Sequence, residues 1–169
     1  SLMAEFGCNF ILQEDFFNDL NRIVESSKHE YVLFLVDDLI FRDCFSLRGI
    51  ERFMDQYQDM ECFSLRLGKN IEDAVAPEFF ARNDDILVWE TSSGLGRTWK
   101  YFWELSSSIY RKNLVRKYFR KCSSEKVGFP NPLETYYYGR MPTQIGGGRG
   151  IRKLARTIRF LNASKSNRM

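Results

Sequence analysis

Apolar side chains recur at helical spacing in two segments of the first third of the chain. In residues 13–27 they stand three or four positions apart, at Phe16, Phe17, Leu20, Ile23 and Val24. In the second segment a serine at position 46 precedes the apolar positions Ile50, Phe53, Met54 and Tyr57. Both patterns predict amphipathic helices, and Ser46 is of the residue type that caps a helix N-terminus.

Shorter apolar stretches predict strands. Residues 31–36, YVLFLV, are continuously apolar and rich in aromatic and branched side chains, which is typical of a strand buried on both faces. Residues 62–67 alternate between small or polar and apolar side chains, a pattern of a strand with one buried face, and 86–89 follow a turn signal at 83–85. With a further helix over 107–121, the alternation of elements predicts an α/β fold with a largely parallel sheet.

Two acidic residues interrupt the most apolar of these stretches. Asp37 and Asp38 follow Val36 directly, and the apolar run resumes at Leu39. A carboxylate in such a run requires a helix N-terminus, a basic partner or a metal ion to offset its burial. The doublet stands at the carboxyl end of a predicted strand, where open α/β sheets bind ligands. On these residues alone, capping of the next turn is favoured over a site for a divalent cation.

Charge divides the chain into an acidic and a basic part. Residues 1–100 carry a net charge of −9 and residues 101–169 a net charge of +12. A glycine-rich stretch, QIGGGRG at 144–150, precedes a predicted basic amphipathic helix over 151–161. Such a helix suits an anionic membrane surface, a nucleic-acid partner or plain packing against the acidic part.

Cysteine and histidine content limits the metal and redox chemistry. The chain has four cysteines without a CxxC pair and a single histidine, which excludes a zinc knuckle and gives no disulfide framework. No apolar run reaches 18 residues. These features favour a cytoplasmic protein, with peripheral attachment to a membrane as the role of the basic segment.

Five stretches in order, EYVLFLVDDLIF, CFSLRLGKN, ILVWE, WELSSSIYR and NPLE, resemble bacterial family 2-like glycosyltransferases of the GT-A type. The resemblance covers about residues 9–134. It implies a nucleotide-diphospho-sugar donor, an unknown acceptor, and a GT-A-like, Rossmann-like sheet flanked by helices. In the family an aspartate motif at the end of a central strand binds a metal–diphosphate; here its first position is Val36.

The resemblance also implies roles for individual residues. Asp38 corresponds to the metal-binding aspartate, with Mn²⁺ or Mg²⁺ as the ion, and Asp37 supports the ribose or the ion. Glu104 and Glu134 are the candidates for the catalytic base, and Glu104 is preferred because it precedes a predicted helix beside the aromatic Trp103. For Glu104 the alternative is an ordinary first-turn helix glutamate favoured by the helix dipole, and the serines 106–108 are expected to be caps. The expected substrate-binding residues also include Arg66 and Trp103, the latter as a sugar-stacking face.

The same comparison predicts the organisation of the chain. Residues 1–143 would form a GT-A-like domain that lacks the family's N-terminal nucleotide-binding units, so self-association or a partner would complete the sheet. Residues 144–169 would form the glycine-rich linker and basic helix. The alternative to a glycosyltransferase is a non-catalytic binding module that engages nucleic acid or an anionic membrane through this basic segment.

Overall fold

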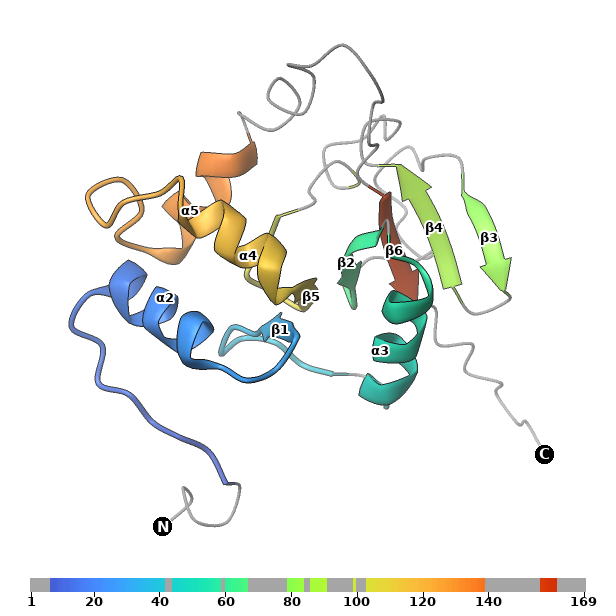
Figure 1. The fold of residues 1–169 in the computed structure, drawn as a ribbon, viewed down its shortest axis with the longest axis horizontal. Helices are drawn as coiled ribbons and strands as arrows, with labels where there is room; N and C mark the ends of the chain where they lie inside the picture. The colour runs from blue at the N-terminus through green and yellow to red at the C-terminus, as the bar shows by residue number, and fades with distance from the viewer. Residues whose placement is uncertain are drawn as a thin grey trace.

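The protein is a mixed α/β structure. The computed structural model describes residues 7–41, 44–58, 60–66, 79–83, 86–90, 99, 103–138 and 156–160. In chain order they form α2 (Phe16–Ser26), β1 (Tyr31–Phe34), α3 (Leu47–Gln56), β2 (Met60–Ser64), β3 (Phe80–Asn83), β4 (Ile86–Glu90), β5 (Ser108–Arg111), α4 (Lys112–Phe119), α5 (Pro130–Tyr138) and β6 (Arg156–Phe160) (Figure 1).

The strands form one six-stranded sheet in the order β1-β5-β2-β6-β4-β3. Within the described residues β2 and β6 are the one parallel pair, and the other four neighbouring pairs are antiparallel. The prediction of a largely parallel sheet was therefore wrong for the part of the chain that the structure describes, and a Rossmann-like fold stays a prediction. The error began at residues 108–111, which were assigned to a helix and instead form β5, antiparallel to both β1 and β2.

The last described strand corrects a second prediction. Residues 156–160 lie inside the predicted basic helix 151–161, but they form β6, which is hydrogen-bonded to β2 on one side and β4 on the other. Ile158 belongs to the helical series at 151, 154, 155, 158 and 161, but with Phe160 it also forms the alternating pattern of a strand. The sheet offers two strands to pair with. The glycine-rich stretch 144–150 lies outside the described residues, and the domain boundary at 143/144 stays a prediction.

The first two helices are placed as their local sequence predicts. The side chain of Asp15 accepts a hydrogen bond from the Asn18 amide (3.0 Å) at the start of α2, and Asp19 accepts from the Asp15 amide (3.0 Å) in return. Ser46 caps α3 by accepting from the Gly49 amide (3.0 Å). These bonds satisfy amide groups that the helix backbone leaves without partners.

The sheet separates two apolar clusters, and β5 contributes to both. Tyr110 belongs to a cluster formed with residues of α2, α4 and α5, whereas its neighbour Ile109 belongs to a cluster formed with α3. Since successive strand residues point to opposite faces, α3 covers one face of this part of the sheet and the other helices cover the other. None of the helices in the described residues is long and apolar enough to cross a membrane.

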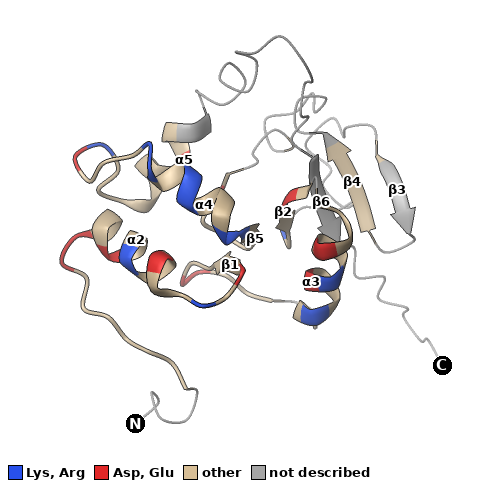
Figure 2. Ribbon diagram, in the orientation of Figure 1, with Lys and Arg blue, Asp and Glu red and all other residues tan. Residues whose placement is uncertain are grey.

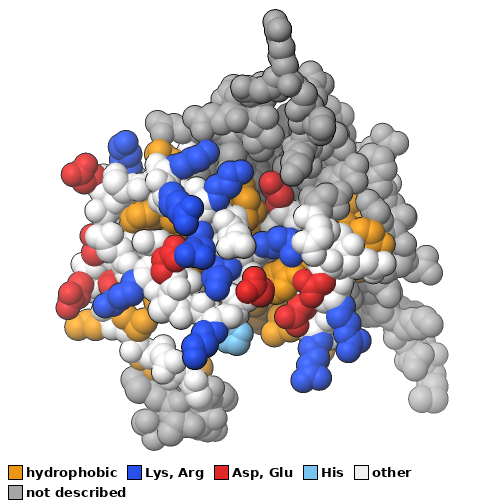
Figure 3. All heavy atoms as spheres, viewed as in Figure 1, with side chains coloured by type: hydrophobic (Ala, Val, Ile, Leu, Met, Phe, Trp, Pro, Cys, Tyr) orange, Lys and Arg blue, Asp and Glu red, His pale blue; other side chains and the backbone are white. Residues whose placement is uncertain are grey.

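The basic and acidic parts of the chain meet on the surface. The side chains on α4 include Lys112, Arg116 and Lys117, and Arg116 forms a salt bridge with Glu25 of α2 (2.5 Å). Figure 2 shows the basic residues of α4 beside α2, and Figure 3 shows acidic and basic side chains intermixed on this face. At least this section of the basic part therefore packs against the acidic part.

Candidate functional site

The aspartate doublet lies in an exposed turn just after β1. The strand ends at Phe34, and the Leu39 amide donates to the Val36 carbonyl (3.3 Å), which turns the chain at Asp37 and Asp38. Both aspartates are exposed. Within β1 only Phe34 is buried, and β1 lies at the edge of the described sheet, so the predictions of a doubly buried strand through Val36 and of a central position were wrong.

The turn suits a metal ion only with further ligands. Carboxylate oxygens are the ligands that Mg²⁺ and Mn²⁺ prefer. However, the described residues contain no group of three or more Asp, Glu, His or Cys side chains that could hold an ion by themselves. Two exposed carboxylates fit a cation that is shared with phosphate oxygens of a ligand, which is a common arrangement for Mg²⁺.

A buried carboxylate, Glu104, accepts three hydrogen bonds and forms one salt bridge at the end of β2. Its Oε2 accepts from Arg66 Nε (2.8 Å) and forms a salt bridge with Arg66 Nη2 (2.6 Å). Its Oε1 accepts from the hydroxyls of Ser64 (3.3 Å) and Ser108. Glu104 is 1% exposed, and both serines are buried as well. The carboxylate is therefore fully enclosed in a network of donors.

Two opposing influences act on the protonation of Glu104. Burial raises the pKa of its carboxyl group, because the charged form loses water, and this is the larger influence. The Arg66 guanidinium and the hydroxyls of Ser108 and Ser64 favour the charged form and reduce the rise. The net pKa lies above the ordinary value.

The backbone around Glu104 is fixed by two further side chains. The Leu105 amide donates to Glu134 Oε1 (2.6 Å) from α5, and the Glu104 amide donates to the Tyr110 hydroxyl (2.8 Å). Ser107 has a positive φ of 56°, which bends the chain into β5. Glu134 thus contacts the residue next to Glu104, so the structure brings the two predicted catalytic glutamates close together. The serines 106–108 do not cap a helix, because α4 begins four residues later.

Trp103 packs in the core. It is 1% exposed, and its ring lies 4.8 Å from Tyr118 and 4.9 Å from Tyr110 by ring centroids. In this structure it therefore presents no face to solvent on which a sugar ring could stack. Its expected role in substrate binding stays a prediction, and its observed contacts are those of a core residue.

The pairing register places these groups at one end of the sheet. Ser108, the first residue of β5, lies opposite Phe34 on one side and Ser64 on the other. The carboxyl ends of β1 and β2 therefore lie on either side of the start of β5. The Asp37–Asp38 turn leaves the sheet at this end, and so does Arg66 with its partner Glu104.

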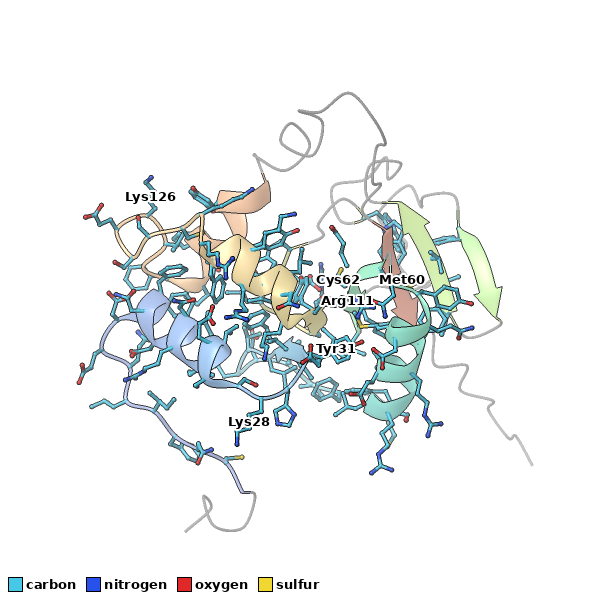
Figure 4. All side chains as sticks on the ribbon, viewed as in Figure 1. Lys28, Tyr31, Met60, Cys62, Arg111 and Lys126 are labelled. Atoms are coloured by element: carbon cyan, nitrogen blue, oxygen red, sulfur yellow. The ribbon has the colours of Figure 1, made fainter. Side chains whose placement is uncertain are left out.

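A second polar cluster lies at the opposite end of β1, and no sequence pattern predicted it. Arg111 donates to the Tyr31 hydroxyl (3.1 Å) and to the carbonyls of Met54, Tyr57 and Met60, and Tyr31 in turn donates to Asp55 (Figure 4). Burial and Asp55 raise the pKa of Tyr31 to about 12. A polar hollow of about 290 Å³ adjoins this cluster. The residues of this cluster come from β1, α3, β2 and β5 and the turn after α3, so no local motif could reveal it.

Comparison with known proteins yields one distant relationship. No family model matches the sequence, and no solved structure matches it. The chain is 30% identical over 125 residues to the bifunctional glycosyltransferase pgtA of Dictyostelium discoideum. The match covers 62% of this chain and 16% of that protein. The chain is thus similar to a small part of a much longer glycosyltransferase.

Proposed function

We propose that this chain is part of a glycosyltransferase that takes a sugar from a nucleotide-diphosphate donor. The observation that supports the proposal is that the Asp37–Asp38 turn follows the carboxyl end of β1, and Arg66 with its partner Glu104 that of β2, at the same end of the sheet. Such an end combines oxygen ligands for a cation with a guanidinium for phosphate, which are the groups that a diphosphate leaving group requires. The similarity to pgtA supports the same reaction class.

In this proposal Asp38, supported by Asp37, holds Mn²⁺ or Mg²⁺ together with the donor diphosphate. The bound cation would neutralise the negative charge on that diphosphate as the sugar departs. The protein's own contribution is the fixed turn, in which the Leu39 amide closes on the Val36 carbonyl (3.3 Å) and keeps both carboxylates at the surface.

The two glutamates take different roles. A general base needs a carboxylate oxygen within reach of the acceptor hydroxyl. Both oxygens of Glu104 already accept bonds from protein donors, and its side chain is closed to solvent. Glu134 is only half-buried, so its side chain is more accessible to an acceptor than that of Glu104. We therefore assign the base to Glu134 and a positioning role to Glu104.

A thermal unfolding series tests the metal assignment. MnCl₂ with UDP or GDP should raise the Tm of the full chain, because a ligand at about 100 times its Kd stabilises the folded state by about 2.7 kcal/mol. For a chain of this size that corresponds to roughly 5–10 °C. MnCl₂ alone should have little effect, since the described carboxylates form no complete ligand set.

The matched variants decide the outcome. Asp38→Asn should abolish the shift, whereas Glu51→Gln, which removes an exposed carboxylate from α3, should leave it intact. An unchanged shift in Asp38→Asn, or no shift in the wild type with either nucleotide, would show that this chain does not bind the donor as proposed.

A further inference from the structure

We propose that Arg66 is a preformed binding site for phosphate groups that acts without a metal ion. The buried Glu104, which two serine hydroxyls hold in place, fixes its guanidinium in one orientation at the end of β2. The ligand class is a diphosphate or a similar multiply charged phosphate. The identification of that ligand with the donor nucleotide rests on the proposed function, whereas the binding itself rests on the geometry of Arg66.

The position of Arg66 is set by the sheet. It stands two residues after the end of β2, and its own amide donates to the Ser64 hydroxyl (3.3 Å). Its side chain runs from this point to Glu104, where Nε and Nη2 meet the same carboxylate oxygen at 2.8 and 2.6 Å. Glu104 belongs to the segment that Glu134 and Tyr110 fix through its backbone.

Exposure distinguishes the two partners of this ion pair. The Glu104 side chain is 2% exposed, whereas that of Arg66 is 38% exposed. The carboxylate end of this network is thus buried, whereas its guanidinium end is accessible to solvent. By contrast, Arg116 and Glu25 are exposed to similar extents, 35% and 37%, which is the pattern of an ordinary surface ion pair.

A guanidinium held in this way suits phosphate. Its planar donors match two oxygens of a phosphate group, and an arginine that is already oriented loses little side-chain entropy on binding. Two hydroxyl donors also bond the Glu104 carboxylate, so the arginine is not the sole donor that stabilises its charge. An arginine can donate two parallel hydrogen bonds to two phosphate oxygens of a ligand, whereas a lysine at the same position would offer only a point charge.

Calorimetric titration with inorganic pyrophosphate in EDTA tests the inference on the full chain. The wild type should bind pyrophosphate and UDP, and orthophosphate more weakly. Arg66→Gln and Arg66→Lys should each weaken binding at least tenfold. Arg52→Gln, which removes an exposed arginine from α3, should bind as the wild type does. The double variant Arg66→Gln/Glu104→Gln leaves no buried charge without its partner, and it should also lose binding.

The outcomes separate this inference from the proposed function. Asp38→Asn should keep its affinity for pyrophosphate in EDTA even though it loses the manganese-dependent shift. If that shift is missing in the wild type but pyrophosphate binding depends on Arg66, the phosphate site stands and the transferase proposal fails. Pyrophosphate that does not bind the wild type, or that binds a folded Arg66→Gln or Arg66→Lys equally well, would overturn the inference.

Discussion

Replacement of Glu104 by Ala and by Gln should have very different effects on stability. Alanine would leave the hydroxyls of Ser64 and Ser108 buried without their common acceptor and would open a cavity beneath Arg66. Removal of one member of a buried ionic network costs about 3–5 kcal/mol. Because Arg66 is 38% exposed and can regain water, we expect the lower part of that range.

Glutamine retains most of the network. Its carbonyl oxygen can accept from Arg66 while its amide group donates to the two serine hydroxyls, which can rotate to accept. The charge-assisted part of the bonds is lost, but so is the desolvation of a buried carboxylate, which is the main cause of its raised pKa. The expected cost is below about 1.5 kcal/mol.

Urea unfolding followed by tryptophan fluorescence measures both variants, since Trp103 is buried beside the network. The midpoint and slope give the free energy of unfolding in water. Glu125→Ala, at an exposed position, provides the control and should stay within about 0.5 kcal/mol of the wild type. A cost below 1 kcal/mol for Glu104→Ala, or equal costs for Ala and Gln, would refute the reasoning from the enclosed carboxylate.

Two further predictions follow from the described contacts. As pH falls from the raised pKa of Glu104 to its ordinary value of 4.5, the wild type should gain stability relative to Glu104→Gln, because the folded state binds the proton more tightly than the unfolded state. Urea midpoints from pH 7 to pH 4 measure this difference in stability. A loss of relative stability as pH falls would contradict the prediction. Arg111→Met should lower the free energy of unfolding by about 1.5–3 kcal/mol, because carbonyls at the end of α3 lose their cationic donor, and Arg52→Met, measured in parallel, should change it little.

Local features of the sequence were sufficient for the elements that local interactions determine. The helix predicted over 13–27 is observed as α2 and the one after Ser46 as α3, because caps and apolar spacing act within a few residues. Strands were also predicted near β1, β2 and β4, with ends that differ by at most three residues. The apolar spacing in the predicted helix 107–121 also indicates an inward face of four residues. Three of them are buried in α4 and the first is half-buried: Leu114, Val115, Tyr118 and Phe119.

The errors concern properties that depend on distant partners. The sequence SIYR fits the start of an amphipathic helix, yet it lies between β1 and β2 and pairs with both as β5. Strand direction depends on such long-range pairings, so local sequence patterns could not show whether the strands are parallel or antiparallel. The Arg66–Glu104 bond joins residues 38 positions apart, and no spacing rule links them. Arg66 and Glu104 were singled out from the sequence, but their direct contact was not.

Because β1 lies at the edge of the described sheet, the Asp37–Asp38 doublet beside it affects the tendency of the chain to aggregate. An edge strand presents unpaired amides and carbonyls to other chains, and an uncharged, apolar and β-prone segment of six or seven residues is the usual nucleus of a cross-β fibril. Here Leu35, Ile40 and Phe41 are exposed beside such a segment, and the two aspartates interrupt it. Charges in that position act as gatekeepers, because stacked copies would bring like charges together. The doublet therefore protects this edge from self-assembly whether or not it ever meets a cation.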